Sequence, residues 1–160
     1  MTTGSTSGAS GANYDYTKES SYPRSGRDLL GGVAFLARSI DKMRAHIAGT
    51  AGEYVALRGL SQRVFDLYGL TAEQFMEVVR EGGDDEAVLR RLQERGAKQP
   101  TEQEIQAHNE AVLSRGPQDE EGMQRMRANL EKMGFGDRTD VNTHVDAEDL
   151  EEGREVPRRG

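Results

Sequence analysis

Residues 29–49 read LLGGVAFLARSIDKMRAHIAG, and this stretch decides the fold that we expect. Its large apolar residues recur at spacings of 4, 3, 4, 3 and 4: Leu29, Val33, Leu36, Ile40, Met43 and Ile47. These spacings are typical of the buried face of one α-helix. We therefore predict a long helix that begins near Gly26, behind a capping pair of Ser25 and Asp28, and ends at Gly49.

Shorter helical patterns follow, each bounded by a capping residue or a glycine. They cover residues 61–68, 71–81, 84–95, 101–115 and 119–133. Residues 53–57 are compatible with a strand, but no second strand is available to pair with them. The sequence therefore predicts an all-α fold, a compact bundle of about six helices with a long N-terminal helix and flexible termini.

Composition divides the chain into three segments. Residues 1–21 begin with an uncharged run of Thr, Gly, Ser and Ala, and we expect this segment to be disordered or extended. We expect the helical domain at residues 22–135. Residues 136–160 carry eight acids and four bases, which favours an acidic C-terminal arm that is extended or partly ordered.

The whole-chain composition excludes several classes of protein. The chain has 160 residues, a net charge of −7 and no cysteine, which excludes disulfides and thiolate chemistry. No run approaches the roughly 20 apolar residues of a membrane helix, and the start lacks the pattern of a secretory signal. We expect a soluble, cytoplasmic protein that binds neither membranes nor nucleic acid, because a nucleic-acid backbone needs a broad basic face.

Metal and cofactor sites have little support. His46, His108 and His144 do not show the close spacing of a metal site, so we expect neither a metal nor a cofactor. His108 is interpreted as a surface or groove residue.

The first predicted helix is the place where a functional site is most expected. Residues 24–58 hold six bases and three acids, against the acidic balance of the rest of the chain. At about 100° per residue, Arg38 and Lys42 lie opposite the apolar stripe, with Asp41 beside them. Small and aromatic residues share that side, so we expect these charges to be partly buried and therefore paired. The local positive charge suits an anionic small molecule, an acidic partner or the acidic C-terminal segment.

Three functions are compatible with this pattern. The first is a helical module that binds a small anion or an acidic protein partner through Arg24, Arg38, Lys42 and Arg44. The second is an enzyme acting on an anionic metabolite. Its catalytic candidates are Asp41 or Glu53 as general base and Tyr54 or Lys42 as general acid, with Arg38 clamping the substrate. The third is a regulatory interaction protein in which the charges form a purely structural network.

Several motifs of the chain resemble one family. They are Tyr22–Ser25 (YPRS), Leu36–His46 (LARSIDKMRAH), Gly49–Tyr54 (GTAGEY) and, more loosely, Asp84–Leu89 and Glu152–Pro157. This combination resembles a family of small bacterial proteins known as domain of unknown function 5069. The resemblance extends from Tyr22 onward and implies that the charged positions of the first helix belong to the family's motif. It implies no particular activity.

Overall fold

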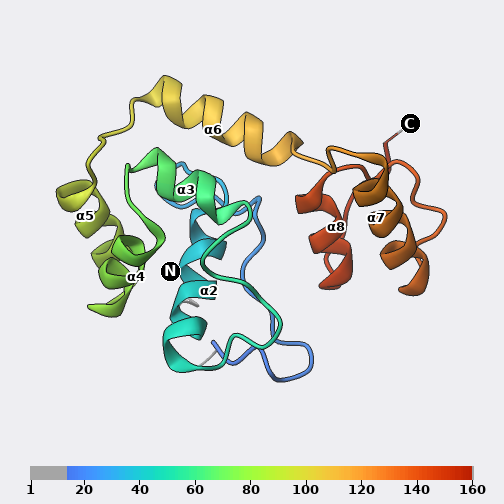
Figure 1. Ribbon diagram of the computed structural model, residues 1–160, viewed down its shortest axis with the longest axis horizontal. Helices are drawn as coiled ribbons and strands as arrows, with labels where there is room; N and C mark the ends of the chain where they lie inside the picture. Colours follow the sequence, from blue (N-terminus) through green and yellow to red (C-terminus); the bar gives the residue numbers. More distant parts are fainter. Residues whose placement is uncertain (1–13, 160) are drawn as a thin grey trace. The chain divides into compact units, whose positions relative to one another are not determined.

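The computed structural model describes residues 14–159, and the disordered start expected for residues 1–13 lies outside them. The described residues form seven α-helices and no strand (Figure 1), which confirms the all-α fold. The helices are α2 (Leu36–Ala48), α3 (Ser61–Leu67), α4 (Ala72–Arg80), α5 (Asp85–Arg95), α6 (Glu102–Ser114), α7 (Glu120–Lys132) and α8 (His144–Glu151). They divide into two compact units, with the boundary after Asn109, and each unit is described by itself.

The first unit is built around α2. This helix packs against α3 and α4, and α4 packs against α5. Leu36, Ile40 and Met43 of the predicted stripe are fully buried on α2. The rings of Phe65 and Phe75 join α3 to α4, with their centroids 4.8 Å apart. The apolar spacing therefore identified the central helix and its buried face.

The start of that helix was predicted wrongly. The helix begins at Leu36, about three turns later than Gly26. Gly31 and Gly32 have φ angles of 57° and 79°, and Phe35 has a φ of 69°, all in the left-handed region that a helix cannot contain. Leu29, which the stripe placed in the core, is 58% exposed. The glycine pair thus forms a turn before the helix.

Two residues of α6 hold this turn. The Asn109 side chain accepts a hydrogen bond from the Ala34 amide (2.8 Å) and donates one to the Gly32 carbonyl (2.9 Å). Nε2 of His108 lies 2.9 Å from the Ala34 carbonyl, and His108 is buried. The surface position expected for His108 is therefore wrong. These bonds satisfy the backbone groups that a longer helix would have used.

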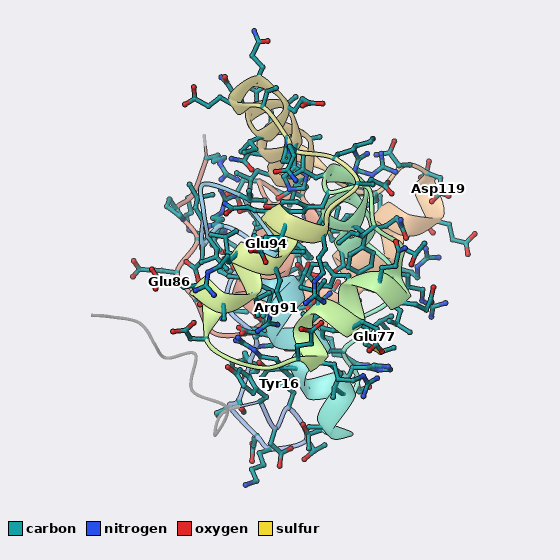
Figure 2. The ribbon with its side chains drawn as sticks, turned by 90° about the vertical axis from the view of Figure 1, so that its left-hand side faces the viewer. Tyr16, Glu77, Glu86, Arg91, Glu94 and Asp119 are labelled. Carbon is teal, nitrogen blue, oxygen red and sulfur yellow. The ribbon has the colours of Figure 1, made fainter. Side chains whose placement is uncertain are left out.

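The end of α4 is fixed by α5. Arg91 points from α5 towards α4 (Figure 2), and its guanidinium donates to the carbonyls of Val78 and Gly82. The last carbonyls of a helix have no partner within the helix, so they need hydrogen-bond donors from elsewhere. Asp84 then caps α5 by accepting from the Ala87 amide at 3.0 Å. Residues 81–84, between the two helices, are thereby held in place.

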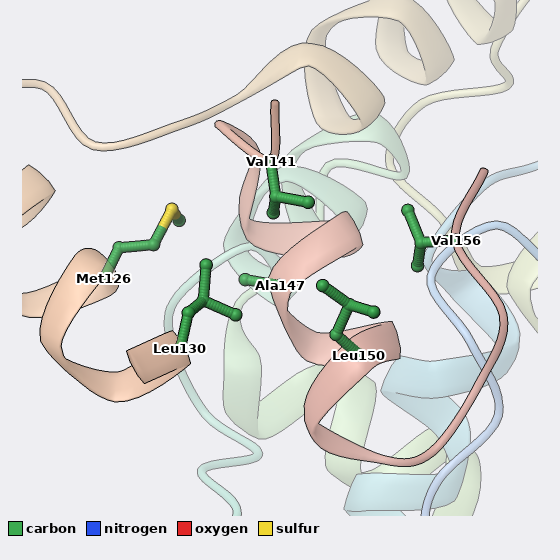
Figure 3. Close-up of a cluster of buried hydrophobic side chains, with 6 residues drawn as sticks. All are labelled: Met126, Leu130, Val141, Ala147, Leu150 and Val156. Carbon is green, nitrogen blue, oxygen red and sulfur yellow. The ribbon is translucent and has the colours of Figure 1, made fainter. Parts of the chain in front are cut away.

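The second unit has its own small apolar core, formed by α7, α8 and the segments on either side of α8 (Figure 3). The side chains of this core are Met126, Leu130, Val141, Ala147, Leu150 and Val156. Arg138 donates to the carbonyls of Val156 (2.9 Å) and Pro157 (3.3 Å), which ties the last residues to this core. The segment in which we expected an acidic arm thus contains α8 and contributes several of the core side chains.

No helix of the described residues has the length and apolar character that crossing a membrane requires.

Candidate functional site

Most of the charged residues singled out in the sequence meet beside α2, together with Tyr14 and Asp85, and we call this group the charged cluster. Its members are Tyr14, Arg24, Arg38, Asp41, Lys42, Arg44 and Asp85. Four of them project from α2, because positions 38, 41, 42 and 44 fall within two turns of one helix. Arg24 comes from the segment before the glycine turn, and Asp85 is the first residue of α5.

Arg24 is the centre of the cluster. Its Nε and Nη2 donate to the two carboxylate oxygens of Asp41, each at 3.0 Å, and its backbone amide donates to the same carboxylate at 2.9 Å. Its Nη1 and Nη2 also donate to the two oxygens of Asp85, at 2.7 and 3.1 Å. Such two-pronged contacts are the strong, directional form of an arginine–carboxylate pair. Arg24 therefore joins α2 to α5 through two carboxylates.

Arg44 closes the other side of Asp85. Its Nη1 donates to Asp85 at 3.2 Å and to the Tyr14 hydroxyl at 2.8 Å, and its Nη2 donates to the Gly83 carbonyl at 3.1 Å. The guanidinium carbon also lies 5.2 Å from the centre of the Tyr14 ring. Most of the donors of Arg44 are thus engaged by groups of the first unit.

Arg38 and Lys42 occupy a different environment. Both side chains are buried, with exposed fractions of 1% and 6%. Lys42 Nζ lies 5.1 Å from the centre of the Phe35 ring, and the Arg38 guanidinium lies 5.9 Å from the same ring and 5.5 Å from that of Tyr54. Arg38 also donates to the Arg24 carbonyl at 3.1 Å. Two cations one helical turn apart therefore share an aromatic ring.

Two further residues that the sequence predicted for the site, Tyr54 and Glu53, are not members of the charged cluster. Tyr54 contacts Arg38 and also packs edge-on against Tyr16, with ring centroids 5.5 Å apart. Glu53, a candidate general base, is exposed, and the second carboxylate of the cluster is that of Asp85. Tyr54 is thus beside the cluster, whereas Glu53 is on the surface.

These contacts and burial shift the pKa values of three members of the cluster. Burial by itself raises the pKa of Asp85, but hydrogen bonds and positive charge from Arg24 and Arg44 outweigh it and hold that pKa below its usual value. Burial would lower the pKa of Arg24, and the bonds to Asp85 and Asp41 instead raise it. Burial raises the pKa of Tyr14 despite the nearby Arg44. At neutral pH the arginines and Asp85 therefore form ion pairs, and the neutral Tyr14 hydroxyl accepts a hydrogen bond from Arg44.

Sequence analysis did not assign two members of the cluster to the site: one is Tyr14, and the other is Asp85. It lies 61 positions from Arg24, and no local spacing connects the two. One signal was present, because the motif resemblance included Asp84 and Asp85 directly after a glycine pair. Asp84 caps the helix, which leaves the carboxylate of Asp85 for another role.

Within residues 14–159, no three His, Asp or Glu side chains converge in a way that could hold a metal ion.

A known family matches most of the chain. Residues 20–154 match the sequence profile of a family described as Domain of unknown function (DUF5069). No curated protein matches the chain. The matched region includes every member of the charged cluster except Tyr14.

Proposed function

The chain belongs to the DUF5069 family, and from the contacts of its charged cluster we propose that it is a non-enzymatic binding module that holds an anionic group beside Arg38 and Lys42. The observation that carries the proposal is the pair of buried cations over one Phe35 ring. Like charges this close repel one another, and burial strengthens the repulsion because the surrounding dielectric constant is low. Both side chains already have interaction partners in the folded chain, and a bound anion adds charged oxygens to them.

The four cationic side chains of the cluster have two different roles in this proposal. Arg24 and Arg44 direct their donors to Asp41, Asp85 and neighbouring backbone or tyrosine oxygens, and so act as the frame. Arg38 and Lys42 are the groups that we propose contact the anion. Suitable anions are a small carboxylate or phosphate, or an acidic side chain of a partner protein, since all present the same charged oxygens.

The enzyme alternative has weaker support. A general base needs an oxygen that can reach the proton it removes. Both oxygens of Asp41 accept hydrogen bonds from Arg24, and Glu53 lies on the surface. These positions favour binding over proton transfer.

A structural network is the second candidate. It is favoured by Asp85, which bridges Arg24 and Arg44 and so links three separate segments of the first unit. In this reading the charges stabilise an interaction protein, and Arg38 and Lys42 contact no ligand.

A thermal-unfolding screen separates these two candidates. Wild type, Lys42→Met and the control Arg90→Met, at an exposed arginine of α5, are melted with phosphate, succinate or an oligoglutamate peptide. A ligand at 100 times its Kd stabilises the folded state by about 2.7 kcal/mol. We expect such a shift in wild type and Arg90→Met and its loss in a folded Lys42→Met. The peptide arm separates a protein partner from a small anion. If no anion stabilises wild type, the binding proposal is wrong and the structural network is retained.

A further inference from the structure

Phe35 has a backbone conformation that a large side chain rarely adopts. It is the residue directly before α2, and its φ of 69° and ψ of −5° lie in the left-handed region, which favours glycine. This conformation costs free energy in a residue that has a Cβ, and such conformations concentrate at functional sites. A glycine or an asparagine would accept the position at lower cost. We therefore looked for a role of the aromatic ring that offsets the strain of its backbone.

The surroundings of Phe35 hold its backbone and its ring. The Phe35 amide donates a hydrogen bond to the Gly26 carbonyl at 2.9 Å, and its carbonyl accepts one from the Ser39 amide at 2.9 Å, in the first turn of α2. Phe35 is only 1% exposed, so the ring is surrounded by protein. The ring is thus fixed at the start of α2.

The ring of Phe35 lies beside the two buried cations of α2. Positions 35, 38 and 42 are spaced by three and four residues, which places them on one side of the helix. The centre of the ring is 5.1 Å from the Lys42 ammonium and 5.9 Å from the guanidinium carbon of Arg38. Both distances are within the roughly 6 Å over which the negative face of a ring attracts a cation, and exclusion of water strengthens the attraction. Arg38 and Lys42 have further partners in the folded chain, and the ring is a contact that they share.

We propose that Phe35 is a positioning residue, whose strained backbone is retained because its ring holds Arg38 and Lys42 in place. Two cations that are already held on one ring lose less conformational freedom when an anion binds, and binding is stronger for that reason. This use of the ring rests on the function proposed above, whereas the attraction between the ring and the cations needs no ligand. In the opposing interpretation Phe35 is only an apolar core side chain, and the electron density of its ring is immaterial.

Fluorinated phenylalanines separate these two interpretations in the full chain. Mono-, di- and trifluorinated phenylalanine at position 35 keep the shape and apolar character of the ring, but each fluorine withdraws electron density and weakens the attraction for cations. We expect the midpoint of thermal unfolding to fall stepwise, by roughly 3–8 °C for the trifluorinated ring. The matched control is the same series at Phe75, which is fully buried and packs on the Phe65 ring at 4.8 Å. A fall at position 35 that is no larger than the fall at Phe75 overturns the proposal.

Anion binding measures the positioning role itself. The probe is phosphate, succinate or the oligoglutamate peptide, whichever stabilises wild type. Phe35→Leu keeps an apolar side chain without an aromatic face, and we expect the Kd of the probe to rise at least about fivefold, while Arg90→Met retains the wild-type value. An unchanged Kd in a folded Phe35→Leu overturns the positioning role. If none of the three probes binds wild type, the proposed function is wrong, and the fluorinated series, which contains no anion, still decides whether the ring holds the cations.

Discussion

Replacing Asp85 by asparagine should destabilise the protein far more than removing an exposed charge. Asp85 accepts three hydrogen bonds from two arginine side chains, and its own side chain is 15% exposed. Asparagine keeps the shape and one acceptor but removes the negative charge between Arg24 and Arg44. Breaking such a partly buried pair costs about 2–4 kcal/mol in free energy of unfolding. That loss corresponds to a fall of roughly 5–15 °C in the midpoint of thermal unfolding.

Urea unfolding followed by circular dichroism measures this loss. The matched control is Glu77→Gln, which removes an ion pair with Arg80 whose side chains are 62% and 49% exposed. We expect the control to change stability by less than about 1 kcal/mol. A change of the same small size in Asp85→Asn would show that the cluster does not hold α2 and α5 together.

The pH dependence of the same variant gives an independent check. The pKa of Asp85 is lower in the folded state than in the unfolded state, so its contribution is present at neutral pH and is lost as the pH falls through the folded pKa. Wild type and Asp85→Asn should therefore differ in stability at pH 7 and converge in acid. A difference that stays constant down to about pH 2 contradicts this origin, because ordinary carboxyls are protonated there.

Three further predictions test other parts of the fold. Burial lowers the pKa of His108, so the free energy of unfolding of wild type should decrease as the pH falls below about 6.5, by up to about 1.4 kcal/mol per pH unit. Urea unfolding of His108→Gln at a series of pH values should lack this contribution to the pH dependence. Gly52 has a φ of 60°, and an added Cβ would lie 2.6 Å from the Tyr16 carbonyl oxygen. Gly52→Ala should therefore lower the free energy of unfolding by about 1–3 kcal/mol, measured as a lower midpoint of thermal unfolding. Leu130→Ala empties a fully buried position of the second core and should cost about 2–5 kcal/mol, with amide exchange rising first in residues 120–156.

The helices could be predicted from sequence wherever a short-range signal marked their ends. Thr71 and Gln74 form both bonds of the capping box that their spacing suggested, and Asp84 and Asp119 cap α5 and α7. Each of these bonds joins residues three positions apart, so the pattern is visible in the sequence. The all-α fold follows from the same local information.

The start of α2 and the carboxylate of Asp85 could not be predicted in this way. The apolar spacing continued to Leu29 by coincidence, while the turn that interrupts it is held by Asn109 from a distant helix. The pairing of Asp85 with Arg24 likewise depends on how α5 packs. The charged positions of α2 were identifiable because helical geometry alone brings them together.

The hydrogen bonds between α6 and the turn before α2 determine when the first unit can fold during synthesis. Ala34 and Asn109 are 75 positions apart. The turn before α2 is therefore synthesised long before the Asn109 side chain that forms hydrogen bonds with its backbone. Until then the backbone groups of residues 32–34 that bond to Asn109 are bonded to water. Contacts this distant in sequence slow folding, because a long loop must close first. The first unit can therefore complete its fold only after translation has passed residue 109. The part of α6 that carries Asn109 is thus the last element that the first unit needs.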